Sequence, residues 1–279
     1  MEIHHYTKAS TLPLILSSKK FRFTRADSLD DEAEMPFAST HVDAKKFYVS
    51  SWTAAQGEHS GQWARYGDRD AGVRLTFRTT PFTYHTLDFN ITRDRNSSKS
   101  GRDVGVELLK VATPFSRTTM FGNGYVIVPH GEDMRESFGG PVAYVEDPAS
   151  YAKRFIKASL KETTIVGGAN LARIKSPGWA DQREYRFVLM AIAGPKSDYE
   201  AAPDAYETSL LDLMEERSNS ASVSSEMKYI DLPFDPEALR SLEVTLGSKI
   251  SSQDRDAVLH ALQIHAPEAT VRESSMRVR

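Results

Sequence analysis

The sequence contains no cysteine, and this absence removes two kinds of structure from consideration. A chain without cysteine forms no disulfide bond and holds no metal through thiolates, while its redox compartment stays undetermined. Apolar runs are short as well, and none approaches the ~20 residues that a membrane-spanning helix requires. Residues 1–7 lack the apolar stretch of a secretory signal peptide. We therefore expect a soluble, cytoplasmic protein without a membrane partner.

The chain also lacks an excess of positive charge. Its 35 Lys and Arg residues stand against 38 Asp and Glu residues, which gives a net charge of −3. Such a balance creates no general attraction for the phosphate backbone of nucleic acid. A nucleic-acid enzyme or binder is therefore the least favoured function, and it would depend on local basic residues. Those residues are Lys45, Lys46, Arg65, Arg69 and Arg74.

The common cofactor and catalytic signatures are missing. There is no G-x-G-x-x-G or Walker sequence for phosphate binding, no G-x-S-x-G turn and no H-E-x-x-H metal motif. His4 and His5 are adjacent, but neighbours on a strand point to opposite faces, so they do not chelate one metal together. The acidic stretch 26–36 has no supporting histidine, and its role is not readable from the sequence. We expect no metal site.

Alternating apolar residues and helix caps predict an α+β fold with a mixed, mostly antiparallel β-core flanked by helices. A strand at 242–246, a helix at 251–265 and a strand at 269–271 predict a C-terminal β-α-β closure of that core. Further strands are expected at 2–7, 19–24, 46–53, 72–77, 104–112, 125–129, 141–145 and 187–190, and further helices at 12–16, 57–66, 147–160 and 209–217. Residues 88–102 are expected to form an exposed polar loop.

We expect a single domain over residues 1–279. It would consist of a core (1–195), a mobile insert (196–225) and the C-terminal β-α-β unit (226–279). The insert is assigned on its small, acidic and serine-rich composition. The role of residues 82–145 and the oligomeric state are not readable from the sequence.

The densest cluster of polar side chains lies directly before a buried strand. Residues 187–190 are apolar, and the run is bounded by glycine, which predicts a central strand. It is preceded by Gln182, Arg183, Glu184 and Arg186. Burying a carboxylate is costly unless it is paired, so Glu184 belongs either to a structural ion pair with Arg183 or Arg186, or to a functional site. On an extended strand, Gln182, Glu184 and Arg186 would share one face.

Three segments of the chain together resemble a known family. They are His5-Tyr6-Thr7, then Ser50-Ser51-Trp52-Thr53 with Trp63-Ala64-Arg65-Tyr66, and finally Lys175, Trp179 and Glu184-Tyr185-Arg186. In this order they resemble the bacterial family called domain of unknown function 2971, over most of residues 3–190. The chain departs from that family in the acidic stretch, where Asp30-Asp31-Glu32 stands in place of an Asn-Asp-Pro.

The same segments are similar to the motifs of the ADP-ribosyltransferase superfamily, and this resemblance implies an ADP-ribosyltransferase-like fold with NAD as substrate. It implies that His5 binds the adenosine ribose or the diphosphate side of NAD, and that Ser50 or Ser51 supports the pocket. Glu184 would hydrogen-bond the 2′-OH of the nicotinamide ribose, and Gln182 would face the acceptor. The remaining candidates for NAD binding are Tyr6, Thr7, Trp52, Trp63, Tyr66 and Arg186. For each aromatic residue, core packing is the competing interpretation.

The implied reaction suits a glutamate at position 184. Cleavage of the nicotinamide–ribose bond builds positive charge on the sugar, and a fixed carboxylate in a dry pocket stabilises that charge. Nicotinamide leaves as a neutral ring, so no second carboxylate is needed as a general acid.

We therefore expect an NAD-dependent ADP-ribosyltransferase, or an NAD glycohydrolase if water is the acceptor. Families of this kind include bacterial toxins and phage-defence effectors. The sequence does not show whether the acceptor is a protein, a nucleic acid, a small molecule or water. The alternative is a non-catalytic nucleotide-sensing or protein-binding module, which would keep the pocket without turnover.

Overall fold

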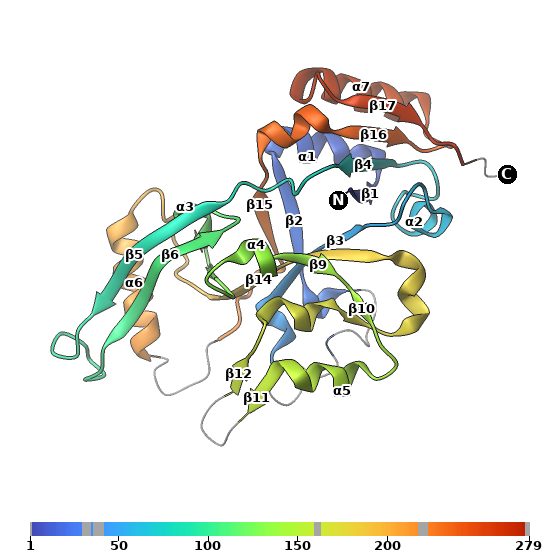
Figure 1. Cartoon of the computed structure of the whole chain (residues 1–279). Helices are drawn as coiled ribbons and strands as arrows, with labels where there is room; N and C mark the ends of the chain where they lie inside the picture. Colours follow the sequence, from blue (N-terminus) through green and yellow to red (C-terminus); the bar gives the residue numbers. More distant parts are fainter. Residues whose placement is uncertain (1, 30–34, 36–41, 159–162, 217–222, 277–279) are drawn as a thin grey trace.

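The computed structural model describes residues 2–29, 35, 42–158, 163–216 and 223–276 (Figure 1). Its largest element is an 11-stranded sheet. The strands of this sheet are β1 (Ile3–Thr7), β2 (Lys20–Arg25), β3 (Phe47–Thr53), β4 (Val73–Phe77), β7 (Phe121–Gly122), β8 (Tyr125–Val128), β9 (Gly139–Pro141), β14 (Glu184–Ala193), β15 (Tyr229–Pro233), β16 (Glu243–Leu246) and β17 (Thr270–Glu273). Paired strands in this sheet are antiparallel, except that β16 and β17 run parallel.

The sheet is split along one edge of β3. Its main path runs β17-β16-β4-β1-β3-β14-β8-β7, and β2, which pairs with β15, joins β3 beside β1. β1 pairs with the end of β3 at Thr53, whereas β2 pairs with its beginning at Tyr48 and Val49. β14 occupies the whole of the other edge. Within the described residues, positions 50–52 of β3 therefore face a gap between β1 and β2.

Helices and three small sheets surround this frame. The α-helices are α1 (Leu12–Ser18), α2 (Ser60–Arg65), α3 (Arg117–Met120), α4 (Met134–Ser137), α5 (Pro148–Ala152), α6 (Pro203–Glu216) and α7 (Ser252–His265). The 3-10 helices are η1 (Ala9–Thr11), η2 (Ala26–Ser28), η3 (Ala44–Lys46), η4 (Lys153–Phe155), η5 (Gly168–Arg173), η6 (Pro177–Gln182) and η7 (Pro236–Ser241). The small sheets pair β5 (His85–Arg93) with β6 (Val104–Thr113), β10 (Ala143–Tyr144) with β13 (Ile174–Lys175), and β11 (Ile156–Ala158) with β12 (Thr163–Ile165).

The short helix α1 follows from its local sequence. Pro13 lies in its first turn, where the missing N–H breaks no helical hydrogen bond. Lys19, with a left-handed φ of 54°, ends the helix. The face formed by Leu12, Ile15 and Leu16 is buried, and α1 packs beside α7, as Figure 1 shows.

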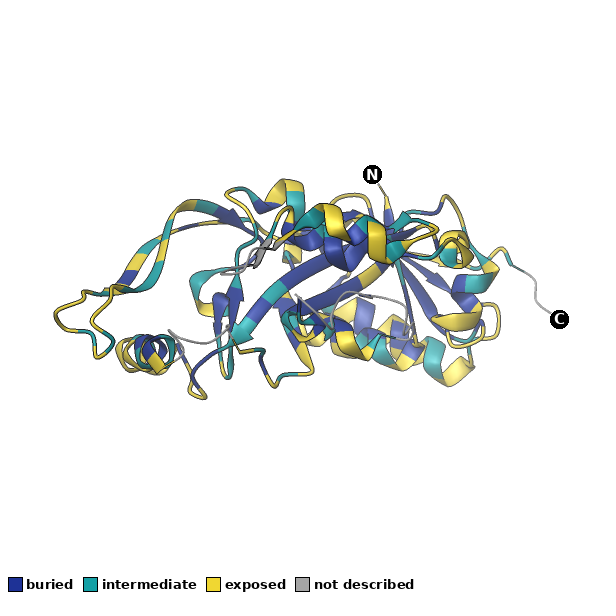
Figure 2. Ribbon diagram, turned by 90° about the horizontal axis from the view of Figure 1, so that it is seen from below, coloured by how far each residue is buried: buried dark blue, intermediate teal, exposed yellow. Residues whose placement is uncertain are grey.

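Two apolar clusters lie on the two faces of the sheet. The larger contains Phe187 and Leu189 of β14 together with side chains of α1, α6 and α7. The smaller contains Val188 together with side chains of α5 and η5. Residues 187–189 of β14 are therefore buried on both faces, and the central strands are mostly dark blue in Figure 2.

A two-stranded arm projects from this body. β5 and β6 extend away from the sheet, with α6 packed against them (Figure 1). Arg93 of β5 ties the arm to α6 through Asp212 Oδ1 at 2.9 Å and Glu215 Oε1 at 3.1 Å.

The α+β class, the mostly antiparallel sheet and its flanking helices agree with the sequence-based prediction, and so does the C-terminal β-α-β unit formed by β16, α7 and β17. The predicted helix over 147–160 is confirmed at its start, where Asp147 caps α5, but it is wrong beyond residue 155: β11 begins at Ile156 and pairs with Ile165. The apolar packing of Ile156 and Ile165 on the smaller cluster favours the hairpin over a longer helix.

The predicted polar loop over 88–102 is also wrong in its first part. β5 continues to Arg93 because Leu87, Phe89 and Ile91 alternate with polar residues and pack toward the core. Helix α6 starts at Pro203, earlier than predicted, so much of the proposed mobile insert is helical. Residues 217–222 of that insert, and residues 30–34 and 36 of the acidic stretch, lie outside the described residues.

Candidate functional site

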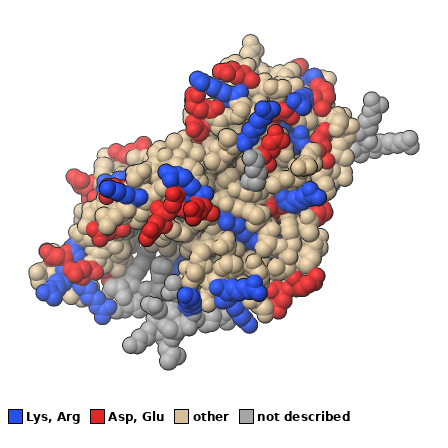
Figure 3. Space-filling model, viewed as in Figure 1, with Lys and Arg blue, Asp and Glu red and all other residues tan. Residues whose placement is uncertain are grey.

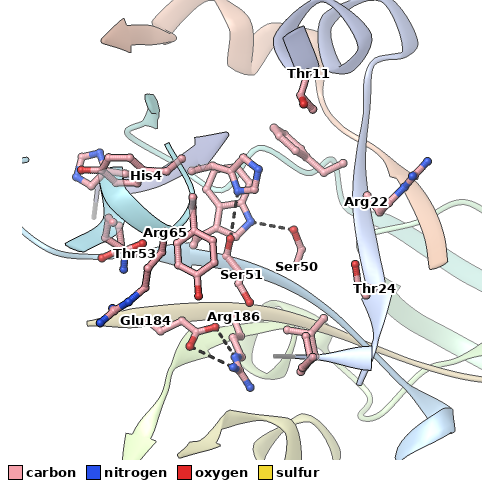
Figure 4. A pocket seen from close by; sticks show the side chains of 18 of the residues that line it. His4, Thr11, Arg22, Thr24, Ser50, Ser51, Thr53, Arg65, Glu184 and Arg186 are labelled. Atoms are coloured by element: carbon pink, nitrogen blue, oxygen red, sulfur yellow. Dashed lines mark hydrogen bonds and ion pairs between the residues drawn. The ribbon is translucent and has the colours of Figure 1, made fainter. Parts of the chain in front are cut away.

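The split in the sheet opens into a cavity of about 750 Å³. Side chains from β1, α1, β2, β3, α2, η6 and β14 line it (Figure 4). Successive residues of a strand point to opposite faces, so Ser50 and Ser51 would ordinarily face different compartments. The gap beside residues 50–52 lets both reach the same cavity.

This cavity brings together side chains from all three predicted segments. Glu184 pairs with Thr53 across β14 and β3, and Thr53 pairs with His4 across β3 and β1. The three segments therefore lie on neighbouring strands, in one row of the sheet. The predicted residues that line the cavity are His5, Tyr6, Ser50, Ser51, Trp52, Tyr66, Gln182, Glu184 and Arg186.

Two predicted site residues lie elsewhere. Thr7 is buried in β1 and is not among the residues that line the cavity. Trp63 belongs to α2, and its side chain is fully buried. Its ring meets Tyr6 edge-on at 4.9 Å, and its Nε1 donates to Glu58 Oε2 at 3.0 Å. Trp63 thus packs behind Tyr6 and supports the wall of the cavity.

Glu184 lies at the centre of a buried charged group. Its Oε1 accepts a hydrogen bond from Arg186 Nε at 2.6 Å, and its Oε2 accepts from Arg186 Nη2 at 3.1 Å and from Lys175 Nζ at 2.9 Å. Lys175, Glu184 and Arg186 are 5%, 6% and 2% exposed. Arg186 Nη1 also donates to the carbonyl of Ala172 at 2.8 Å. Pairing of this kind is what allows charges to remain in a protein interior.

The pairing decides the ionisation state of Glu184. Burial alone acts to raise the pKa of its carboxyl group, but the charges and hydrogen bonds of Arg186 and then Lys175 outweigh this, and the pKa is lowered below its ordinary value of 4.5. Glu184 is therefore a fixed carboxylate at neutral pH.

Gln182 reaches this group by a different route from the one predicted. It is not on the strand, because η6 ends at Gln182 and Arg183 takes a left-handed φ of 41° before β14 begins. The prediction that Gln182 shares a strand face with Glu184 and Arg186 is therefore wrong. Its Oε1 nevertheless accepts from Lys175 Nζ at 3.1 Å, so Lys175 bridges Gln182 and Glu184.

The two adjacent histidines face different surroundings, as strand geometry predicts. His5 Nδ1 lies 3.1 Å from the carbonyl of Ser51, and its ring stacks at a tilt 4.9 Å from Trp52. A carbonyl only accepts, so Nδ1 carries the proton and Nε2 is an acceptor when the ring is neutral. Burial lowers the pKa of His5, with the Ser51 carbonyl opposing, which keeps the ring neutral at pH 7.

His4 points to the other face and was not predicted as a site residue. Its Nδ1 lies 2.9 Å from Thr76 Oγ1. Burial, assisted by the nearby charge of Arg74, lowers the pKa of His4 to about 4. His4 is therefore a neutral, buried hydrogen-bonding residue at the end of the cavity near Thr53.

Trp52 and Ser50 contribute more to packing than to the open cavity. Trp52 is 3% exposed, and its Nε1 donates to Ser50 Oγ at 3.1 Å. Its ring also meets Phe21, Phe77 and Phe187 edge-on. The competing interpretation of core packing therefore describes most of the Trp52 side chain.

The cavity also contains residues that sequence reasoning did not assign to it. Lys175 and Trp179 were part of the family resemblance but had no role, and Arg65 was a candidate only for nucleic acid. Lys175 comes from the two-residue strand β13, which leaves no periodic signal in the sequence. Among the described residues that line the cavity, the charged side chains are Lys20, Arg22, Arg65, Lys175 and Arg186 against Glu184 and Asp231. The lining is thus mainly cationic in a chain whose net charge is −3.

Other classes of site find little support in the structure. Arg74 is buried, and Arg65 lines the cavity, so the basic residues proposed for nucleic acid do not share one exposed patch. Figure 3 shows positive and negative side chains intermingled over much of the visible face. Within the described part of the chain, no group of three or more His, Asp or Glu side chains is placed to hold a metal ion. No helix in that part is both long and apolar enough to cross a membrane.

Comparisons with known proteins give one match. No curated protein and no solved structure matches the chain. The match covers α2 to the middle of β14, which includes Lys175, Glu184 and Arg186, and leaves out β1 and β3. Residues 62–187 match the family described as "Protein of unknown function (DUF2971)", which supports the resemblance to that family of domains.

Proposed function

We propose that the cavity binds NAD and that the protein cleaves the nicotinamide–ribose bond, as an ADP-ribosyltransferase or, with water as acceptor, as an NAD glycohydrolase. The observation that carries this proposal is the meeting of the three segments around one cavity. His5 on β1, Ser51 on β3 and Glu184 at the start of β14 come from strands that neighbour each other in the sheet. Their order and mutual placement suit a ligand that spans the split.

Glu184 would act on the ribose. Each carboxylate oxygen offers two lone pairs, and Oε1 accepts only from Arg186 among the described contacts. Oε1 therefore keeps capacity for the 2′-OH of the nicotinamide ribose. The low pKa of Glu184 keeps the group charged while positive charge develops on the sugar.

In the proposed reaction, the glycosidic bond breaks and its electron pair stays with nicotinamide, which leaves neutral. An acceptor oxygen forms the new bond to the anomeric carbon and gives up its proton to solvent. Neutral His5, with Nε2 as an acceptor, would hold a hydroxyl of the adenosine ribose, and Ser51 would supply a hydroxyl at the floor of the split. Gln182 would lie on the acceptor side of Glu184.

A second function is favoured by the charge around Glu184. Arg186 contacts both carboxylate oxygens and Lys175 contacts Oε2, and two cations beside the ribose oppose the positive charge that cleavage would create. This arrangement suits a nucleotide-sensing module that binds NAD without cleaving it.

The two functions are separated by measuring binding and turnover on the same protein. Calorimetry reports NAD binding, and chromatography reports nicotinamide release. Binding with release supports the enzyme, binding without release supports the sensing module, and the absence of binding rejects both. Ser51→Ala is a useful variant because Ser51 is exposed and its loss spares the core. The proposal expects weaker NAD binding in this variant, with unchanged thermal stability.

A further inference from the structure

The wall of the cavity around Trp179 gathers cationic side chains from different elements. Lys175 Nζ lies 5.0 Å from the centre of the Trp179 ring, and Arg65 Cζ lies 5.5 Å from it. All three residues line the cavity. Arg65 Nη1 also contacts Asp181 Oδ2 at 3.1 Å, which holds its guanidinium at this wall. Figure 4 shows Arg65 reaching toward the side of the cavity where Glu184 and Arg186 lie.

The side-chain amide of Gln182 completes this wall. A lysine ammonium only donates, so the Gln182 atom that faces Lys175 is Oε1, and Nε2 points elsewhere. Nε2 is buried and has no hydrogen-bond partner among the described residues, and Gln182 as a whole is 1% exposed. The backbone of Gln182 is held in place, because its carbonyl accepts from Thr53 Oγ1 at 2.7 Å and from Gln62 Nε2 at 3.1 Å.

A buried donor without a partner costs free energy that a ligand acceptor can recover. Gln182 lines the cavity, its Oε1 is held by Lys175 Nζ, and its Nε2 is such a donor. A phosphate group matches this set, since it offers several acceptor oxygens and negative charge together.

We infer that Arg65, Lys175 and the Gln182 amide form a phosphate subsite at the Trp179 wall. Within the proposed function, on which this step rests, Gln182 lies on the acceptor side of Glu184. The phosphate then belongs to the acceptor and not to NAD. The acceptor class is accordingly a phosphate monoester, a chemistry that a free nucleotide and the 5′-phosphorylated end of a nucleic acid share.

Tryptophan fluorescence gives a direct probe of this subsite. The chain has three tryptophans, of which Trp52 and Trp63 are 3% and 0% exposed, whereas Trp179 is partly exposed and lines the cavity. Titration with inorganic phosphate should change the emission of the full-length protein in a saturable way. The change should disappear in Trp179→Phe, while phosphate binding measured by calorimetry persists in that variant.

Two arginine variants form a matched pair for this test. Arg65 and Arg22 both line the cavity, both are at least partly exposed, and both pair with an aspartate, but Arg22 lies on β2, across the split. Arg65→Gln should weaken phosphate binding on the order of tenfold, whereas Arg22→Gln should change it less than about twofold. Gln182→Glu, which replaces the unpaired donor with a like-sized carboxylate, should weaken binding at least as much as Arg65→Gln. Equal losses in the two arginine variants, or no phosphate binding by the unaltered protein, would overturn the subsite.

Addition of NAD separates this inference from the proposed function. Phosphate should bind equally well when NAD is saturating, and a nucleoside monophosphate or a 5′-phosphorylated oligonucleotide should be modified where its unphosphorylated form is not. Which of the two is modified identifies the source of the phosphate. Competition between phosphate and NAD would overturn the acceptor assignment. Phosphate binding without any nicotinamide release would support the subsite and reject the reaction. Nicotinamide release without phosphate binding would support the reaction and reject the subsite.

Discussion

β14 pairs with β3 over residues 184–190, and the two halves of this stretch, the polar half 184–186 and the apolar half 187–190, are buried in opposite ways. In the first half, Glu184 and Arg186 are buried as charges that satisfy each other and Lys175. In the second half, Phe187 and Leu189 are buried by apolar packing. Each of these four β14 side chains is buried, with at most 6% of its surface exposed.

The difference shows where stability and function compete along this strand. Apolar packing stabilises the second half directly. A buried ion pair gives little net stability, and well-packed apolar residues in its place are often as stable or more so. Because the polar half also lines the main cavity, while Phe187 and Leu189 do not, we attribute its charges to the site and not to the fold.

The largest expected effect comes from breaking the polar half. Glu184→Ala leaves Lys175 and Arg186 without their shared carboxylate in the interior, and we expect a loss of about 3–5 kcal/mol in the free energy of unfolding. Urea denaturation followed by circular dichroism measures this loss. A loss below about 1 kcal/mol would show that the charged group is solvated and not buried.

A comparable loss is expected in the apolar half, but with a different dependence on pH. Leu189 is 0% exposed, and Leu189→Ala should cost about 2–5 kcal/mol through lost packing and a residual cavity. No titratable group is removed, so the loss should be the same at neutral pH and below pH 4.5, where the loss in Glu184→Ala shrinks as the carboxyl group of the unaltered protein becomes protonated. If the loss of unfolding free energy in Leu189→Ala also changed below pH 4.5, the proposed contrast between the two halves would be wrong.

The smallest effect concerns His4, which shares a row with Glu184. The pKa of His4 is about 4 in the folded protein, compared with 6.5 for a histidine in an unfolded chain. A group whose folded pKa is depressed contributes stability that is present above pH 6.5 and is lost as the pH falls toward 4. We expect His4→Gln to flatten the fall of unfolding free energy between pH 6.5 and 4.5. His5 and His130, whose pKa values burial also lowers, remain in the variant and set the residual slope.

Many of the helices and strands could be predicted, because the residues that mark them are close together in the sequence. Pro13, the cap Ser251 and the aromatic and β-branched residues at 47–49 each mark an element that the structure contains. The arm formed by β5 and β6 was missed in part, because its solvent-facing polar residues hid the alternation of Leu87, Phe89 and Ile91.

Only the site residues that lie on long strands could be predicted from the sequence. Glu184 and Arg186 follow from the apolar run behind them, and their ion pair was one of the two alternatives for this cluster. Lys175 could not be predicted, because β13 is two residues long and reaches Glu184 only through tertiary packing. The geometry of Gln182 depends on the left-handed turn at Arg183, a conformation that an arginine rarely adopts and that its sequence does not signal.

The most direct test of the account is nicotinamide release from NAD by the unaltered protein and by Glu184→Gln, both held below the temperature at which the variant unfolds. The account predicts release by the unaltered protein and a loss on the order of 100-fold or more in the variant, since the carboxylate that stabilises the sugar cation is gone. Folding of the variant is checked by circular dichroism in the same buffer. Equal release by the two folded proteins would contradict the role of Glu184, and no release from either would leave the cavity as a binding site alone.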